Sequence, residues 1–356
     1  MSRFLLPRYQ ELAPYVPGEQ PQGRSYIKLN TNESPFPPSM KVVEALNGEK
    51  VARLNLYPDP LAKTLREAIA EEYGLQMENV FVGNGSDEVL GFAFLAYADE
   101  AHPVTIPQVS YGFYKVFSRL FRASPKEIPL NEDFSLPVEK FCHTESMVVL
   151  ANPNAPTALA ISLDDVERIA SANPNHMVLV DEAYVDFGGE SALPLLAQYE
   201  NLLIVRTYSK SRSLAGGRLG YALASPEVVA DLERIKGSFH PYSVNSLTML
   251  AGIEAMRDKA YFEKCIQSIC AQRDSTAQEM RSIGFEMTTS QTNFLLVRHP
   301  KIRGREYYEK LKARGILVRY LSGAGLEDYV RITIGTAEQM ARLMEATQEI
   351  LQEAGA

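Results

Sequence analysis

Two stretches, HMVLVDEAY at residues 176–184 and NLLIVRTYSK at residues 201–210, decide the fold of this chain. Each contains a run of four apolar residues, as in a short buried β-strand, and each run is followed by charged residues. Similar runs occur earlier in the chain, and helix-like segments separate them. The two stretches therefore predict two strands of a sheet that alternates with helices.

The neighbouring sequence repeats this alternation. The run NVFVG (79–83) precedes a helix-like SDEVLGFAFLAYA, and MVVLANP (147–153) precedes SLDDVERIASA, where Ser162 is suited to cap the helix. Farther upstream, a helical pattern from residue 61 ends at Gly74, a typical helix C-cap. Strands that alternate with helices in this way predict an α/β fold with a largely parallel sheet.

The character of the sequence changes after about residue 255. A long polar helical pattern runs from Met256 to Ile283, and the strand patterns TNFLLVRH and VRITIG follow with the helical REYYEKLKARG between them. We interpret this part as a smaller α+β domain. The predicted division is an N-terminal arm at 1–30, a large α/β domain at 31–254 and a small α+β domain at 255–356.

The composition is that of a globular protein, with 46% hydrophobic and 22% charged residues among 356. The formal net charge of −8 argues against nucleic acid as a partner. The three cysteines are too few and too irregularly spaced for a disulfide framework. The start MSRFLLPRYQ does not resemble a signal peptide, and no run approaches the ~18 apolar residues that span a bilayer. We therefore expect a cytoplasmic protein without membrane contact.

Polar residues gather where the predicted strands end, which is where α/β sheets bind ligands. After the first strand, GNGSDE (83–88) opens a helix, and glycines with free helix N–H groups can hold a phosphate. The third glycine of a dinucleotide-binding fingerprint is absent. On its own, this loop is weak evidence, because a tight turn before a capped helix explains it more often than a phosphate site does.

An acid and a lysine follow the two deciding strands. Asp181 is costly at the end of an apolar strand unless it pairs with a cation, such as a protonated pyridine ring. Lys210 is suited to form a Schiff base with a cofactor aldehyde if nearby cations, such as Arg206, Arg212 and Arg218, favour its neutral form. No His or Cys pattern nearby indicates a metal site. A phosphate cup, an acid and a lysine are the parts that a pyridoxal-phosphate site needs.

At this point the chain resembles the fold type I aminotransferases, and specifically the histidinol-phosphate aminotransferase family. The resemblance runs from about Leu12 to the last helix. It rests on ten motifs in the same order: LNTNESPFPPS, YPDP, VGNGSDE, PQVSYGFY, NPNAPT, VDEAYVDF, RTYSKSRSLAGGRLGY, PYSVNSLT, TNFLL and VRITIGT.

The resemblance implies pyridoxal 5′-phosphate as the cofactor and a role for each matching residue. Lys210 is implied as the Schiff-base lysine and acid/base, Asp181 as the partner of the pyridine nitrogen, and Tyr184 as the donor to the 3′ oxygen. Tyr111 is implied to stack on the ring. The implied phosphate ligands are Ser86, Asp87, Ser209, Arg218 and, from the neighbouring subunit of a homodimer, Tyr57.

The resemblance also implies how substrates bind. Arg331 is the expected anion-binding residue, with Arg319 and Tyr15 as its helpers. The implied reaction transfers an amino group from L-histidinol phosphate to 2-oxoglutarate, giving imidazole-acetol phosphate and L-glutamate. The arginines would hold a phosphate in one half-reaction and a carboxylate in the other.

One motif departs from related families, which have Asn-Pro-x-Asn-Pro-Thr-Gly, with the second asparagine on the 3′ oxygen. Here the sequence is NPNAPTA, so Ala155 and Ala158 replace that asparagine and the final glycine. We expect Asn154 to take over the contact.

Several alternatives remain open. An aromatic amino-acid aminotransferase would use the same lysine, acid and arginines. A decarboxylase of a phosphorylated amino acid would keep the same lysine and acid. A non-catalytic regulatory module of this fold usually carries a helix-turn-helix, and no such pattern precedes Leu12. An unrelated nucleotide-binding enzyme would account for the glycine loop, but not for Lys210 together with Asp181.

Overall fold

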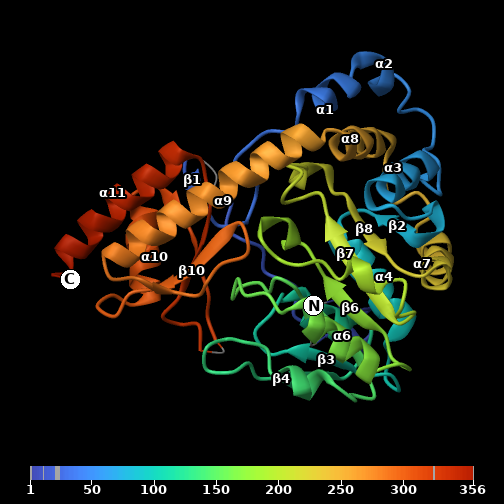
Figure 1. Cartoon of the computed structure of the whole chain (residues 1–356), viewed down its shortest axis with the longest axis horizontal. Coiled ribbons are helices and arrows are strands. Elements are labelled where there is room, and N and C mark those ends of the chain that lie inside the picture. Colours follow the sequence, from blue (N-terminus) through green and yellow to red (C-terminus); the bar gives the residue numbers. More distant parts are fainter. Residues whose placement is uncertain (1, 11, 21–24, 324, 356) are drawn as a thin grey trace.

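The computed structural model describes residues 2–10, 12–20, 25–323 and 325–355. These residues form two main sheets, and each sheet packs with its own helices (Figure 1). The long helix α9 (Lys259–Ser282) runs from one sheet region to the other.

The larger sheet has seven strands in the order β2-β8-β7-β6-β5-β3-β4. The strands from β7 to β4 are parallel to their neighbours, and β8 is antiparallel to both β2 and β7. This confirms the predicted, mostly parallel α/β sheet. Its strands are β2 (Val80–Gly83), β3 (Val104–Pro107), β4 (Pro125–Ile128), β5 (Met147–Ala151), β6 (Val178–Asp181), β7 (Leu202–Thr207) and β8 (Gly220–Leu223).

Helices cover both faces of this sheet because alternate strand residues point to opposite sides. Val178 and Val180 pack in one core with α3, α6 and α8, whereas Leu179 packs in a second core with α4, α5 and α7. The helices of this part are α1 (Met40–Ala45), α2 (Gly48–Val51), α3 (Lys63–Tyr73), α4 (Ser86–Tyr97), α5 (Phe113–Leu120), α6 (Leu163–Ala172), α7 (Pro226–Phe239) and α8 (Ser246–Arg257).

The smaller sheet has the order β12-β13-β10-β9 and is antiparallel throughout. A separate two-stranded pair joins β1 to β11 in parallel, so the end of the predicted N-terminal arm is tied to the C-terminal part. The remaining elements are β1 (Ile27–Lys28), β9 (Glu286–Met287), β10 (Phe294–Arg298), α10 (Gly304–Ala313), β11 (Ile316–Leu317), β12 (Arg319–Tyr320), β13 (Val330–Thr333) and α11 (Ala337–Glu353).

The sequence signals for helix ends act as expected. The Ser162 hydroxyl accepts the N–H of Asp165 at the start of α6, and Gly74 ends α3 in the left-handed conformation with φ of 65°. The single helix expected from Met256 to Ile283 is wrong, because α8 ends at Arg257 and α9 begins at Lys259. Between them, Asp258 leaves helical geometry, and its carboxylate pairs with Lys41 at 3.3 Å.

Short 3₁₀ helices connect several of these elements, at Pro7–Tyr9, Met77–Asn79, Val138–Phe141, Val185–Phe187, Leu193–Leu195 and Ala215–Gly217. Among the residues placed by the structure, no helix is both long and apolar enough to cross a membrane.

Candidate active site

A cavity of about 390 Å³ opens at the carboxyl ends of β5, β6 and β7. Eight of the ten predicted cofactor ligands line it, namely Ser86, Asp87, Tyr111, Asp181, Tyr184, Ser209, Lys210 and Arg218. The other two, Asn154 and Tyr57, do not. The rest of the lining is Gln20, Thr31, Glu33, Ala151, Ala155, Ala183, Thr207, Ala215 and Gly216.

Asp181 ends β6 and is buried at the base of this cavity. Its carboxylate accepts the Tyr114 hydroxyl at 2.8 Å and the Ala183 N–H at 3.2 Å. Burial raises the pKa of Asp181 to about 6, and the two hydrogen bonds oppose this rise. No cation forms an ion pair with Asp181 in the part of the chain that the structure describes. A buried carboxylate in this state is suited to a positively charged ligand.

Lys210 lies just after β7 and projects into the same cavity. Its Nζ donates to the backbone oxygen of Thr31 at 3.3 Å and lies 5.9 Å from the centre of the Tyr184 ring. Within the described residues, no carboxylate comes within ion-pair distance of this ammonium group. Lys210 is therefore available to react with a ligand in the cavity.

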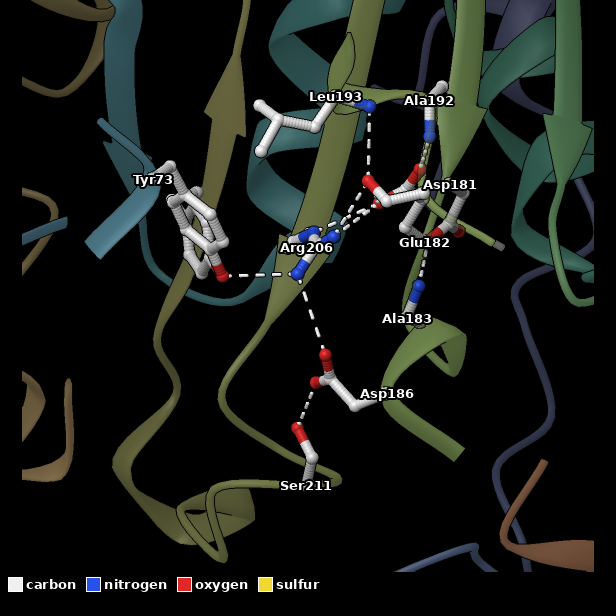
Figure 2. A network of polar contacts seen from close by, with 11 residues as sticks. Tyr73, Asp181, Glu182, Ala183, Asp186, Ala192, Leu193, Arg206 and Ser211 are labelled. Atoms are coloured by element: carbon white, nitrogen blue, oxygen red, sulfur yellow. Dashed lines mark hydrogen bonds and ion pairs between the residues drawn. The ribbon is translucent and has the colours of Figure 1, made fainter. Parts of the chain in front are cut away.

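A buried polar network lies directly behind Asp181 (Figure 2). The Arg206 guanidinium pairs with the Glu182 carboxylate at 2.8 Å and donates to the Tyr73 hydroxyl at 3.1 Å. Asp186 lies 3.5 Å from Arg206 and accepts the Ser211 hydroxyl at 2.5 Å. Because Ser211 follows Lys210, this network ties the lysine-bearing turn to the strand that carries Asp181.

The same network corrects one expectation. Arg206 and Arg212 do not act as free cations beside Lys210, because each is paired with a carboxylate outside the cavity. Arg206 pairs with Glu182, and Arg212 lies 3.6 Å from Glu72. Of the three arginines considered, only Arg218 lines the cavity.

The glycine loop before α4 forms a cradle on one side of the cavity. Gly85 has φ of 83°, and a Cβ on it would lie 2.4 Å from Arg218 Nη2. A Cβ on Gly220 would lie 2.3 Å from the backbone nitrogen of Ser86. The N-cap residue Gly85 offers no side-chain cap to the first turn of α4, and Ser86 and Asp87 of that turn line the cavity. Only glycine lets the two backbones and Arg218 approach this closely.

Asp87 connects the cradle to an aromatic wall. Its carboxylate pairs with Arg218 at 3.1 Å and accepts the Tyr111 hydroxyl at 2.8 Å. Burial raises the pKa of Tyr111 well above its ordinary value, so its hydroxyl keeps its proton. These contacts fix the Tyr111 ring at the wall of the cavity.

Tyr184 contributes a buried hydroxyl to the opposite wall. Asn32 donates to this hydroxyl from its side-chain nitrogen at 2.9 Å. Tyr184 therefore has a fixed partner in the protein before any ligand binds.

Asn154 does not have the position expected for it. Its side-chain nitrogen donates to the Val109 carbonyl at 3.0 Å and to the Thr157 hydroxyl at 2.8 Å, and its oxygen accepts from Ser110 at 2.8 Å. These bonds use both amide hydrogens to hold the neighbouring loops together. Ala155 faces the cavity instead. The expectation that Asn154 takes over the 3′ oxygen contact therefore does not fit this structure.

The three predicted substrate ligands lie close to one another, beside the cavity. Arg331 on β13 donates to the Asn30 carbonyl at 3.1 Å, and its Nε is buried without a hydrogen-bond partner among the described residues. Burial lowers the pKa of Arg331. Burial raises the pKa of Tyr15, whereas Arg331 and Arg319 both act to lower it. Arg319 donates to the carbonyls of Val16 and Pro17, which holds the arm beside β12.

Tyr57 lies on the surface, away from the cavity of its own chain. Its side chain is 83% exposed, and its ring stacks on Tyr242 with a centre-to-centre distance of 4.7 Å. It borders a different hollow, together with Arg53, Leu56 and Met249.

The profile of a known protein family, described as "Aminotransferase class I and II", matches residues 24–346. The chain belongs to this aminotransferase family. It is 48% identical over 350 residues to a histidinol-phosphate aminotransferase of Chromohalobacter salexigens, covering 98% of this chain and 99% of that one. It is 45% identical to a histidinol-phosphate aminotransferase of Clostridium acetobutylicum, covering 99% of this chain and 100% of the relative.

A solved structure shares the fold of this aminotransferase. The histidinol-phosphate aminotransferase of Sinorhizobium meliloti, in complex with pyridoxal-5′-phosphate, has a TM-score of 0.89 at 24% identity and covers 99% of each chain. This likeness confirms the predicted fold type I architecture.

Sequence reasoning missed two residues of this aminotransferase's site. Tyr114, which binds Asp181, stands three residues after Tyr111 in the quoted motif PQVSYGFY. Asn32, which binds Tyr184, stands in the quoted motif LNTNESPFPPS. Both motifs supported the resemblance, but no physical signal in the sequence separated these two side chains from their neighbours.

Proposed function

We propose that this chain is a pyridoxal-phosphate-dependent aminotransferase that converts L-histidinol phosphate and 2-oxoglutarate to imidazole-acetol phosphate and L-glutamate. One observation carries the chemistry: Lys210 and Asp181 face one cavity, and neither has an oppositely charged partner among the described residues. The choice of substrate rests on the full-length relatives at 43–48% identity that carry this activity in their names.

The residues of the cavity fit pyridoxal phosphate. The glycine cradle, the uncapped first turn of α4, Ser86, Ser209 and Arg218 would hold the phosphate, since each supplies a donor or a positive charge. Asp181 would pair with the pyridine nitrogen, which gives this buried carboxylate the cation that it lacks. Tyr111 would cover the ring, and Tyr184 would donate to its 3′ oxygen. When bound, the cofactor supplies an aldehyde and a ring that takes up electrons as a proton leaves the substrate.

The chain's own residues then have defined tasks. Nζ of Lys210 would hold the cofactor covalently and, when freed, would accept the proton that leaves the substrate's Cα. Asp181 would favour the protonated form of the ring nitrogen, because the neutral ring would leave this carboxylate without a cationic partner. The network of Arg206, Glu182 and Asp186 holds both groups in place through Ser211.

Arg331 is the proposed anchor for the anionic end of the substrate. A guanidinium with a buried Nε and no carboxylate partner in the described chain is suited to a phosphate or a carboxylate. Arg319 and Tyr15 lie close enough to Arg331 to interact with it electrostatically, and they add polar groups to its surroundings. The same three residues would serve both half-reactions.

We also propose a homodimer in which Tyr57 reaches the partner's cofactor. The segment from α1 to residue 57 exposes an unusual number of apolar side chains, namely Met40, Val43, Val51, Leu54, Leu56 and Tyr57. Large apolar side chains that are exposed along one segment are suited to a subunit interface. Tyr57→Phe should leave the dimer intact in light scattering but weaken cofactor retention. Unchanged retention would contradict the shared-residue role.

The proposal also includes a division into domains and a location in the cytoplasm. The two sheets support a large domain at 31–254 and a small one at 255–356. Cys142, Cys265 and Cys270 are all free thiols, as expected for a protein of the reducing cytoplasm.

The test is a single half-reaction without an amino acceptor. The cofactor-loaded protein is mixed with L-histidinol phosphate, with phenylalanine, or with O-phosphothreonine, and the visible band of the bound cofactor is followed in a stopped-flow spectrometer. Fast loss of the band with histidinol phosphate alone supports the proposal. Preference for phenylalanine would indicate an aromatic aminotransferase, and carbon dioxide release from phosphothreonine would indicate a decarboxylase. Failure to bind pyridoxal phosphate would refute the proposal as a whole.

A further inference from the structure

Ala155 lines the cavity, and its side chain has no hydrogen-bond donor. Related families have an asparagine here, on the 3′ oxygen of the cofactor, but this chain has Ala155. Asn154 cannot replace it, since its amide is bound to Val109 and Thr157. Tyr184 is then the side chain left to serve this oxygen, and the direction of its hydroxyl hydrogen becomes important.

A chain of three hydrogen bonds sets that direction. The Thr333 hydroxyl oxygen accepts the backbone N–H of Asn32 at 2.9 Å, so its own hydrogen points to the side-chain oxygen of Asn32 at 3.0 Å. The amide of Asn32 must therefore turn its nitrogen to the Tyr184 hydroxyl, at 2.9 Å. An amide nitrogen only donates, so Tyr184 accepts this bond and keeps its own hydrogen free.

The surroundings hold Asn32 in this orientation. Asn32 is 1% exposed and has a left-handed backbone with φ of 56°. The side-chain nitrogen of the fully buried Asn293 donates to its backbone oxygen at 3.0 Å. Thr333 belongs to β13, two residues from Arg331, so the chain of hydrogen bonds begins on the strand that carries the proposed substrate anchor.

We propose that Asn32 is a positioning residue that directs the Tyr184 hydroxyl hydrogen to the 3′ oxygen of the cofactor. In this chain it compensates for the asparagine that is absent at position 155. Asn32 does not contact the cofactor and acts only through Tyr184. The inference rests on the proposed binding of pyridoxal phosphate. It gives Asn32 the task of orienting a hydroxyl group, which is distinct from the tasks proposed for Lys210 and Asp181.

The test measures the pH at which the visible band of the bound cofactor titrates. A donor on the 3′ oxygen stabilises its negative charge and thereby favours loss of the proton from the adjacent linkage to Lys210. Asn32→Ala removes the fixed orientation of that donor. The titration midpoint should rise by about one pH unit, a shift equivalent to about 1.4 kcal/mol.

Matched variants separate polarity from packing. Asn32→Asp keeps the shape but accepts from Tyr184, which turns the hydrogen away, so it should shift the midpoint at least as far as Asn32→Ala. Thr333→Val removes the hydrogen that orients Asn32 and should give a smaller shift in the same direction. Asn30→Ala, at a buried asparagine whose side chain donates to the Glu19 carbonyl instead, should leave the midpoint unchanged.

Tyr184→Phe provides the decisive comparison. It should raise the midpoint by itself. Adding Asn32→Ala to it should cause no further change, because without the Tyr184 hydroxyl the chain of hydrogen bonds no longer reaches the cofactor. A wild-type midpoint in both Asn32→Ala and Thr333→Val, or equal extra shifts with and without Tyr184, would overturn the proposal. If Asn32→Ala does not fold, the Thr333→Val result decides.

The outcomes for this inference and for the proposed function are distinguishable. A parent protein that binds pyridoxal phosphate but shows no effect of Asn32 would refute the positioning role alone. A parent without any cofactor band would refute the proposed function, and this inference with it.

Discussion

Asp181 allows a prediction that links catalysis to stability. Its carboxylate is buried without a cation, and burial raises its pKa from 3.8 to about 6. This rise of roughly two pH units corresponds to about 3 kcal/mol against the ionised form in the cofactor-free protein. Asp181→Asn removes the charge while keeping the shape. Its oxygen can still accept from Ala183, and its nitrogen can donate to the Tyr114 oxygen.

The pH dependence has a definite sign. Below about pH 4 the carboxyl group is protonated in both the folded and the unfolded chain, and its burial costs nothing. Between about pH 4 and pH 6 only the folded chain holds the proton, so stability falls as the pH rises. Above about pH 6 the whole cost is present. The substitution should therefore stabilise the cofactor-free protein by about 1.5 kcal/mol more at pH 8 than at pH 5.

The measurement is urea unfolding of both proteins, with and without pyridoxal phosphate, at the two pH values. We expect Asp181→Asn to gain little stability from the cofactor and to lose at least ~100-fold in kcat/KM, since about 3 kcal/mol of favourable pairing is removed. Glu182→Gln is the control, because Glu182 already has Arg206 as its partner and should lose stability at both pH values. A stability difference that does not change with pH, or equal stabilisation of both proteins by the cofactor, would refute the reasoning.

Three further predictions follow from the site. Lys210→Ala should lose the visible band of the covalently held cofactor and at least ~10³-fold in turnover, checked by absorbance and single-turnover assays; activity like that of the parent would eliminate Lys210 as the acid/base. Arg331→Gln should raise the KM of both the phosphorylated amine and 2-oxoglutarate by roughly 30- to 160-fold, because a charged hydrogen-bond donor worth about 2–3 kcal/mol is lost. Arg206→Met should destabilise the protein by about 3–5 kcal/mol in urea unfolding, because it leaves the buried Glu182 carboxylate unpaired. In the last case, Glu182→Gln added to Arg206→Met should restore part of the loss, and a fully additive double variant would contradict the pairing.

The sequence contained enough information to predict the fold. The apolar runs that end at Asp181 and Thr207 form two central strands that pair in parallel, and two short 3₁₀ helices, Val185–Phe187 and Leu193–Leu195, lie in the connection between them. The signals at Gly74 and Ser162 were local, and they held because a left-handed glycine and a serine cap depend on little else. The break at Asp258 was missed because both flanking segments carry the helical pattern, and the lysine that pairs with Asp258, Lys41, is distant in the sequence.

The candidate site was predictable to the extent that residues stand directly at strand ends. Asp181 and Lys210 lie there, and strand topology alone brings them to one cavity. Asn154 was assigned by analogy with a neighbouring position, but side-chain direction depends on contacts with Val109 and Thr157 that sequence spacing does not reveal. Asn32 was missed for a related reason. Its partner Tyr184 is 152 residues away, and Thr333 is 301 residues away.

The adjacent residues Asp181 and Glu182 show why the position of a charge does not by itself indicate function. Both carboxylates are buried at the end of the same strand, and burial raises the pKa of each. Glu182 points to Arg206 and also accepts the backbone N–H of Ala192 at 2.6 Å, so its charge is satisfied within the protein. Asp181 points to the cavity and has only neutral donors, Tyr114 and Ala183. The protein thus stabilises one charge with its own arginine and leaves the other for a ligand. Since an unpaired buried charge lowers stability, its retention beside Lys210 is best explained by a cationic group that binds there.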